Sequence, residues 1–138
     1  AQRRDGTKPY EDLTQMDRVL CDAPCSGYGV LRRKPEIRYK SLESAKELPK
    51  LQLSLLENAA GLVRPGGLLV YSTCTLHPAE NSGVAQRFLA AHPEFAPEAI
   101  RLAGVERCLD EPEHMLTMTP FSGASDGFFA ACFRRKEG

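Results

Sequence analysis

Apolar and turn-forming residues alternate along the chain in blocks that predict a strand followed by a helix. Residues 18–21 (RVLC) form a short apolar, β-branched run that stops at DAP, as a buried parallel strand does. In residues 48–63 apolar side chains recur at helical spacing, with Pro49 in the first turn and RPGG at 64–67 as a stop signal. This helix is amphipathic, so we expect it to lie on a sheet.

The same order of elements then repeats. Residues 68–72 (LLVYS) predict a second buried strand. Pro78 opens a second helix, which His92 and Pro93 end. Two strands joined by a helical crossover should be parallel neighbours with a right-handed connection, so the predicted fold class is α/β.

The remaining residues predict short strands and turns. Residues 97–113 indicate a strand start and a polar excursion, residues 114–120 a strand, and residues 120–127 a turn. Residues 127–135 (GFFAACFRR) predict the last strand, with its three phenylalanines in the core.

Composition narrows the class of protein. With 138 residues, 42% apolar and 26% charged, the chain has the length of one globular domain. It begins without Met in a polar segment, so we expect residues 1–138 to be a single partial domain. No apolar run reaches the length of about 18 residues that a membrane span needs, and the N-terminus lacks the apolar region of a signal peptide. We therefore expect a cytoplasmic protein without a membrane partner.

Charge and cysteine spacing exclude further classes. The 18 basic and 18 acidic residues cancel, so a claim of nucleic-acid binding must rest on a local cluster. The five cysteines form an odd set without C-x-x-C spacing. This spacing favours neither a disulfide framework nor a zinc site, and we expect no metal.

Two of the cysteines follow the two predicted strands. Cys25 comes after the first strand and Cys74 after the second, and ligands of open α/β sheets bind outside the carboxyl ends of such strands. The strands should lie about 4.8 Å apart, so both thiols and Asp22 could face one pocket. We interpret Cys21, Cys108 and Cys132 as inert, buried residues.

The residues beside these cysteines shape the rim of the predicted pocket. Pro24 fixes one backbone dihedral, while Gly27 and Gly29 would let a planar ligand approach the backbone. Cys74 lies four residues before Pro78, near the predicted start of a helix, where the dipole favours a thiolate. The proximity of Cys74 to the helix start only weakly favours Cys74 over Cys25 as the reactive thiol.

A basic cluster follows Cys25. The segment RRKPEIRYK at 32–40 carries five basic residues in nine, and Tyr28 and Tyr39 lie close by. A solvated loop is the alternative, but the position beside Cys25 favours contact with RNA phosphates and bases. The candidate RNA-binding residues are Arg32, Arg33, Lys34 and Arg38.

Three polar residues near Cys74 have both structural and chemical interpretations. His77 could act as a general base, but its place before Pro78 favours a plain helix-entry position. Glu80 and Asn81 face a similar choice between a structural role and support of the site, and Glu80 is placed to accept amides of the helix's first turn.

Three segments together resemble a known family. They are DRVLCDAPCSGYGVLRRKPEIR at 17–38, GGLLVYSTCTLHPAENSGVAQRFL at 66–89 and DGFFAACFRR at 126–135. In order and spacing they resemble the carboxyl half of the RNA cytosine-5 methyltransferases, closest to the bacterial Sun-type group of ribosomal RNA small subunit methyltransferase B. The resemblance implies the carboxyl half of a Rossmann-like class I methyltransferase fold, ending in an antiparallel last strand.

The resemblance also implies a chemistry for the two cysteines. Cys74 matches the cysteine that attacks C6 of the target cytosine, after which C5 accepts the methyl group of S-adenosylmethionine. Cys25 matches the cysteine that releases the enzyme from its product, and Asp22 is implied near the reacting base and the methyl donor. DNA cytosine-5 methyltransferases lack the second of these cysteines, so the pair indicates the RNA type, with small-subunit ribosomal RNA as the partner.

The cofactor residues of the family are only partly present. Asp5, in the segment placed near the adenine, Asp22 and Pro24 are the candidates for binding S-adenosylmethionine. The family's glycine-rich turn should lie upstream of Ala1, and Phe121 stands where many relatives have a histidine. We therefore expect that these 138 residues alone do not methylate RNA.

Two other classes of protein fit part of the pattern. A non-catalytic RNA-binding remnant of the same fold would keep the basic cluster but would not trap a cytosine covalently. A thiol redox protein would need a C-x-x-C or similar pair, and the sequence contains none.

Overall fold

The structure, a computed structural model, describes residues 1–13, 15–31, 33–36, 46–110, 113–123 and 126–138. Two α-helices, α2 (Leu48–Ala60) and α3 (Ser82–Ala91), lie among the strands β1 (Met16–Asp22), β2 (Val63–Thr73), β3 (Phe95–Pro97), β4 (Met115–Met118) and β5 (Phe128–Arg135). Three short helical turns complete the described elements: η1 (Tyr28–Val30), η3 (Glu106–Cys108) and α4 (Pro120–Gly123). Within these ranges, none of the helices has the length and apolar character needed to cross a membrane.

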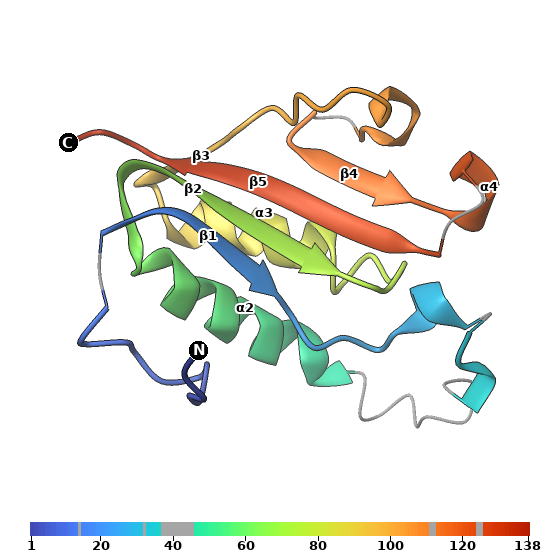
Figure 1. Cartoon of the computed structure of the whole chain (residues 1–138), viewed down its shortest axis with the longest axis horizontal. Helices are drawn as coiled ribbons and strands as arrows, with labels where there is room; N and C mark the ends of the chain where they lie inside the picture. The colour runs from blue at the N-terminus through green and yellow to red at the C-terminus, as the bar shows by residue number, and fades with distance from the viewer. Residues whose placement is uncertain (14, 32, 37–45, 111–112, 124–125) are drawn as a thin grey trace.

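The strands form one mixed sheet (Figure 1). Its order is β1-β2-β5-β3, and β4 also pairs with β5. β1 and β2 are parallel, with Asp22 opposite Ser72 at their carboxyl ends, and β5 is antiparallel to β2. The prediction of adjacent parallel strands followed by an antiparallel last strand is confirmed.

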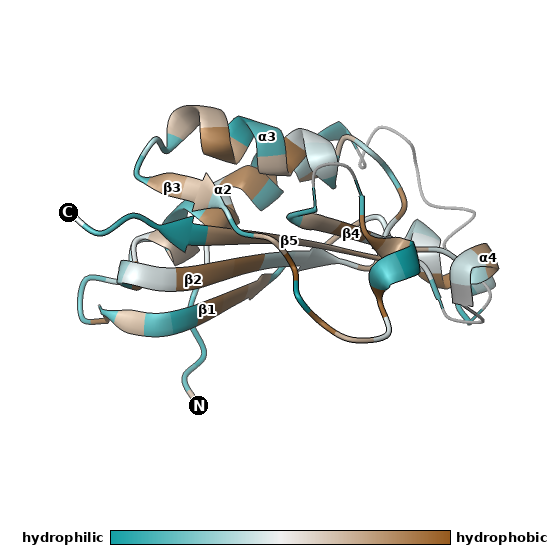
Figure 2. Ribbon diagram, turned by 90° about the horizontal axis from the view of Figure 1, so that it is seen from above, coloured by the Kyte–Doolittle hydropathy of each residue, from teal (hydrophilic) through white to brown (hydrophobic). Residues whose placement is uncertain are grey.

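Both long helices cover the same face of the sheet (Figure 2). The core between them contains Leu56, Leu69, Tyr71, Phe88 and Phe133, all fully buried. The rings of Phe88 and Phe133 lie 5.0 Å apart. Burying each such side chain stabilises the fold by about 1.5–3 kcal/mol relative to leaving it exposed.

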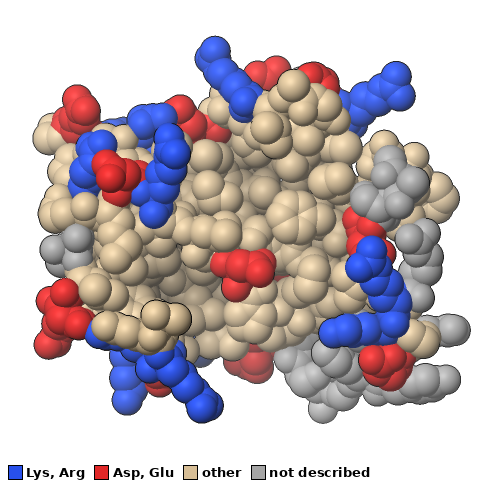
Figure 3. Space-filling model, viewed as in Figure 1, with Lys and Arg blue, Asp and Glu red and all other residues tan. Residues whose placement is uncertain are grey.

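The opposite face of the sheet is covered only in part. A smaller cluster of Cys108, Leu116 and Ala130 lies where the chain around η3 crosses β4 and β5. On β1, Leu20 is 67% exposed, and no residue of this strand is buried, so the prediction of a buried strand at residues 18–21 is wrong because β1 lies at the edge of the described sheet. Figure 3 shows that the charged side chains on this side of the molecule gather mainly at its perimeter.

Several boundaries differ from the sequence prediction. The second helix begins at Ser82, four residues later than predicted, because the amides of Glu80 and Asn81 donate to the carbonyls of His77 and Pro78 in a turn. The RPGG segment belongs to β2, where Gly66 has a φ of 76°, and the pairing with β1 shifts register nearby. Thus β2 starts at Val63, and the predicted turn at 120–127 contains α4.

Candidate active site

The two thiols predicted to share a pocket lie together. Cys25 follows β1 in the loop that η1 ends, and Cys74 follows the last residue of β2. Their Sγ atoms are 3.0 Å apart, and both cysteines are free. The parallel pairing of β1 with β2 is what delivers both sulfur atoms to one end of the sheet.

The two thiols have different surroundings. Cys74 is exposed, whereas Cys25 is half-buried. Burial, and then the contact with Cys74, raises the pKa of the Cys25 thiol to about 12. Cys25 is therefore protonated at neutral pH and can donate its proton in a hydrogen bond to the sulfur of Cys74.

Asp22 lies at the carboxyl end of β1, beside the thiols. The hydroxyl of Ser72 donates to Asp22 Oδ1 over 2.7 Å, and the amide of Ala23 donates to the carbonyl of Ser72 over 3.0 Å. Asp22 itself is exposed. Its carboxylate is therefore held in place by the neighbouring strand and can still reach a ligand.

A buried carboxylate joins the two thiol loops. Glu80 is 1% exposed, and its oxygens accept from the amide and hydroxyl of Ser26 over 2.9 and 2.7 Å and from Gln52 Nε2 over 3.0 Å. Gln52 also donates to the carbonyl of Pro24 over 2.9 Å. A buried charge is tolerated only with such partners, so Glu80 fixes the loop of Cys25 against α2. The predicted role of Glu80 in the first turn of the helix is wrong, because α3 begins after it.

Further polar side chains fix the loop of Cys74. Thr75 shares a 2.7 Å hydrogen bond with the hydroxyl of Ser26, and its carbonyl accepts from Asn81 Nδ2 over 2.9 Å. Thr73 donates to Asn81 Oδ1 over 2.6 Å. Sequence reasoning missed this network. Its one local signal was Gln52, a polar residue on the same helical face as the buried Leu56.

Two glycines bring distant backbone segments into contact at the same place. The amide of Gly29 donates to the carbonyl of Cys74 over 3.0 Å, and the amide of Gly127 donates to the carbonyl of Gly29 over 2.7 Å. A Cβ atom on Gly29 would lie 2.3 Å from the oxygen of Gly127. Gly29 therefore admits another stretch of backbone, and not a ligand as the sequence suggested, while Gly27 supplies a turn with a φ of 75°.

Comparison with known proteins decides the family. Residues 1–134 match the family described as 16S rRNA methyltransferase RsmB/F. The chain belongs to this family.

Relatives of this RsmB/F-family chain extend over most of its length. The probable ribosomal RNA small subunit methyltransferase B of Bacillus subtilis (strain 168) is 42% identical over 145 residues, which cover 99% of this chain and 32% of that protein. Ribosomal RNA small subunit methyltransferase B of Thermus thermophilus is 48% identical over 99 residues, covering 71% of this chain and 24% of that protein. The chain thus spans a third or less of the length of these curated relatives.

A solved structure has the same fold. NSun6 from Pyrococcus horikoshii, crystallised with SFG, superimposes with a TM-score of 0.81 and 26% identity, covering 99% of this chain and 34% of that one. The Rossmann-like fold expected from the sequence is therefore confirmed for this RsmB/F-family chain.

The residues proposed for cofactor binding lie in or beside the lining of one cavity. A cavity of about 580 Å³ lies between the N-terminal segment, β1 and α2, and its lining includes Asp22, Pro24 and Gly6. Asp5 adjoins this lining. Its carboxylate accepts from the amide and hydroxyl of Thr7, and these bonds lower the pKa of Asp5.

The basic cluster is described only in part. Arg33 pairs with Asp126 over 2.8 Å, and Lys34 is exposed. Arg32 and Arg38 lie outside the described residues. Among the other candidates, His77 accepts from the amide of Ala79 over 3.3 Å in the turn that precedes α3, so it does not occupy the predicted helix-entry position, because α3 begins only at Ser82.

The three remaining cysteines and Phe121 lie apart from the thiol pair. Burial raises the pKa of Cys21 to about 11 and also raises the pKa of Cys132, whereas Cys108 is buried in the smaller apolar cluster. The prediction that all three are buried holds for Cys108 alone, because Cys21 and Cys132 are half-buried. Phe121 is fully exposed.

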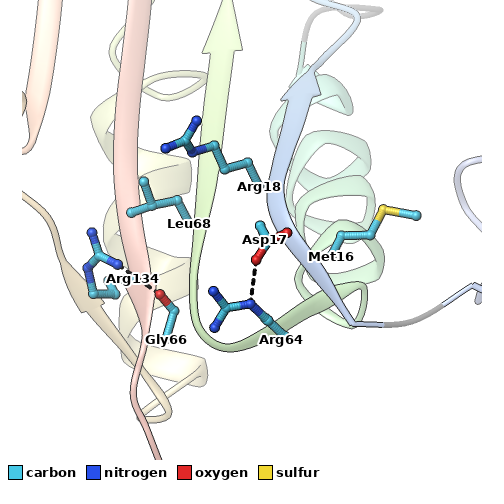
Figure 4. A pocket seen from close by; sticks show the side chains of 7 residues that line it. All are labelled: Met16, Asp17, Arg18, Arg64, Gly66, Leu68 and Arg134. Atoms are coloured by element: carbon cyan, nitrogen blue, oxygen red, sulfur yellow. Dashed lines mark hydrogen bonds and ion pairs between the residues drawn. The ribbon is translucent and has the colours of Figure 1, made fainter.

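A cavity of about 730 Å³ lies at the other end of the strands (Figure 4). Arg64 pairs with Asp17 over 2.6 Å there, and Arg134 donates to the carbonyl of Gly66 over 2.8 Å. Arg134 also pairs with Glu98. This cavity lies at the amino ends of β1 and β2, whereas the thiols lie at the carboxyl ends of the same strands.

Proposed function

We propose that the chain forms part of an enzyme that transfers a methyl group from S-adenosylmethionine to C5 of a cytosine in ribosomal RNA. The observation that carries the proposal is the pair of free thiols, 3.0 Å apart at the carboxyl ends of two adjacent parallel strands. Family membership and the names of the relatives support ribosomal RNA as the substrate.

In this proposal Cys74 is the nucleophile, because its sulfur is the exposed one of the pair. As a thiolate, it forms a bond to C6 of the cytosine, and the electron pair of the C5–C6 double bond becomes available at C5. After C5 has gained the methyl group, a base removes the proton from C5. The double bond re-forms as the bond between C6 and the Cys74 sulfur breaks.

In the same proposal, Cys25 and Asp22 assist the nucleophile. The protonated Cys25 thiol donates a hydrogen bond to the sulfur of Cys74 and so stabilises the negative charge that returns to it on release. The exposed carboxyl of Asp22, anchored by Ser72, is placed to hydrogen-bond N3 of the cytosine.

The cavity between the N-terminal segment, β1 and α2 fits the methyl donor. Its volume of about 580 Å³ lies in the range of small-molecule sites, and its walls combine the apolar Leu20 and Leu55 with the carboxylate of Asp22. Tyr10 and Gly6 would flank the adenine, and S-adenosylmethionine would supply an electrophilic methyl group there. NSun6 from Pyrococcus horikoshii was solved with SFG, an analogue of this cofactor, which supports its use here.

We further propose that residues 1–138 are a partial domain that does not methylate RNA alone. The chain spans 32% of its Bacillus subtilis relative, which supports this view. A single-turnover assay with labelled S-adenosylmethionine and cytosine-containing RNA tests it, and clear methyl transfer by the isolated chain would contradict it.

Covalent trapping tests the chemistry in the full-length polypeptide that contains this chain. An RNA with 5-fluorocytosine at the target position should form an adduct with the unmodified protein, because fluorine at C5 blocks the proton removal that precedes release. Cys74→Ala should lower trapping about a thousandfold or more. With ordinary cytosine, Cys25→Ala should accumulate the adduct, and Cys132→Ala is the matched control. Equal trapping by Cys74→Ala and the unmodified protein would overturn the assignment, and RNA binding without any adduct would favour a non-catalytic RNA-binding protein.

A further inference from the structure

A separate cavity of about 430 Å³ is built from the residues that follow the two thiols. Tyr28 lies three residues after Cys25, and His77 lies three residues after Cys74. The remaining lining residues come from the segment before α2, from the first turn of α2, from the turn before α3 and from α3 itself: Lys46, Pro49, Lys50, Ala79 and Arg87. None of these residues lines the cavity assigned to the methyl donor.

The lining combines apolar surface with positive charge. Pro49, Ala79 and the ring of Tyr28 supply apolar area, whereas Lys46, Lys50 and Arg87 are exposed. Among the described residues, these three cations form no ion pair, and no acidic side chain lines the cavity. This contrasts with the amino-end cavity, where Arg64 and Arg134 are paired with carboxylates.

Tyr28 is held in a fixed relation to the nucleophile. It is the first residue of η1, between Gly27, whose φ of 75° sets the turn, and Gly29, whose amide donates to the carbonyl of Cys74 over 3.0 Å. The tyrosine ring is half-buried. It therefore offers a preorganised surface at a constant distance from the thiol pair.

An aromatic ring surrounded by cations suits a nucleotide of single-stranded RNA. Bases stack on aromatic side chains, and lysine and arginine contact the phosphates on either side. The cavity also lies within the size range of small-molecule sites. We propose that it binds a nucleotide next to the target cytosine in the RNA strand, with its base on Tyr28 and its phosphates at Lys50 and Arg87. This inference rests on the proposed function.

The test uses the full-length polypeptide and two 5-fluorocytosine substrates, a long RNA and a short RNA that consists of the target nucleotide alone. On the long RNA, Tyr28→Ala should weaken binding about tenfold, whereas Tyr28→Phe should bind as the unmodified protein does. The double variant Lys50→Ala with Arg87→Ala should reduce the salt dependence of binding by about 0.7 in log–log slope per lost phosphate contact. Arg107→Ala, an exposed arginine of η3, is the control for lost positive charge.

The short RNA separates this cavity from the catalytic site. Because the short RNA lacks the neighbouring nucleotides, all variants should bind it and trap it as the unmodified protein does. Thermal unfolding of each variant checks that the fold is intact. Two outcomes would show that the cavity has no such role, provided that the unmodified protein traps RNA. In the first, the variants bind the long RNA as well as the unmodified protein does. In the second, the variants lose the same share of binding and trapping on both RNAs. If the unmodified protein forms no adduct with either RNA, the proposed function itself is overturned.

Discussion

The two ends of the sheet use charge in opposite ways. At the carboxyl end, Glu80 is buried and accepts three hydrogen bonds beside the thiols. At the amino end, Arg64 and Arg134 lie near the surface and pair with partly exposed carboxylates. The amino end has the more conspicuous charges, yet the free thiol pair lies at the carboxyl end.

The difference teaches where to look for a site in such a sheet. Exposed ion pairs are screened by water and contribute little to stability. A buried polar network is costly, and in this one Gln52 Oε1 has no partner among the described residues, so its presence marks a place where backbone geometry must be held. Four substitutions can break or sharpen this comparison.

The largest effect is expected for Glu80→Leu. It would leave the amide and hydroxyl of Ser26 and the amide of Gln52 without their acceptor inside the protein. The expected loss is about 4 kcal/mol of unfolding free energy, measured by urea denaturation. Glu94→Leu, which removes an exposed partner of His92, is the control and should unfold close to the unmodified protein. Similar curves for both variants would refute the structural role of Glu80.

A somewhat smaller loss is expected for Gly29→Ala. The new Cβ atom would lie 2.3 Å from the oxygen of Gly127 and 2.6 Å from that of Cys74, and backbone atoms cannot move aside cheaply. We expect about 3 kcal/mol of destabilisation, measured in the same way. Gly61→Ala is the matched control because its φ is −60° and its nearest contact is 3.4 Å. A stable Gly29→Ala protein would show that the loops can separate freely.

A moderate, pH-dependent effect is expected at Cys25. Its pKa is raised from 9.0 to about 12 by burial, so above about pH 9 the unfolded chain releases this proton while the folded chain keeps it. Stability from this group is complete below the unfolded pKa and is lost as the pH rises toward the folded one. Cys25→Ser does not ionise, so its unfolding midpoint should fall less between about pH 8 and about pH 10.5. Parallel pH profiles would contradict the raised pKa.

The smallest effect is expected for Arg64→Ala at the amino end. The pair with Asp17 lies at the surface, although it lowers the pKa of Asp17. The thermal midpoint should barely change, and any change should shrink further in high salt. A clear loss of stability would remove the contrast between the two ends.

Local patterns predicted the elements but not all of their boundaries. Periodicity predicts α2, β2 and β5, because each buries a regular set of side chains, whereas the apolar run that predicts β1 is only partly buried at the edge of the sheet. Pro78 was taken as a helix start, but the turn that follows it delays α3 until Ser82. Turn residues restrict backbone angles without fixing the element that contains them, and RPGG inside β2 shows the same limit.

The sequence likewise predicted some features of the candidate site and not others. Strand order sufficed to bring Cys25 and Cys74 together, since parallel neighbours end at the same edge. The bonds from Ser26 to Glu80 join residues 54 positions apart, and no local pattern records such a pairing. The cavity at Tyr28 was hidden for the same reason, because its cations come from α2, α3 and the segment before α2.

The hydrogen bonds that link Gly29 to Cys74 and Gly127 to Gly29 have a consequence for how the protein folds during its synthesis. A ribosome delivers Gly127 only after Gly29 and the strands β2, β3 and β4 have been synthesised. The loop of Cys74 therefore gains its final support when β5 has emerged and docked, so a nascent chain does not hold its thiols in their final arrangement before translation of this region is complete.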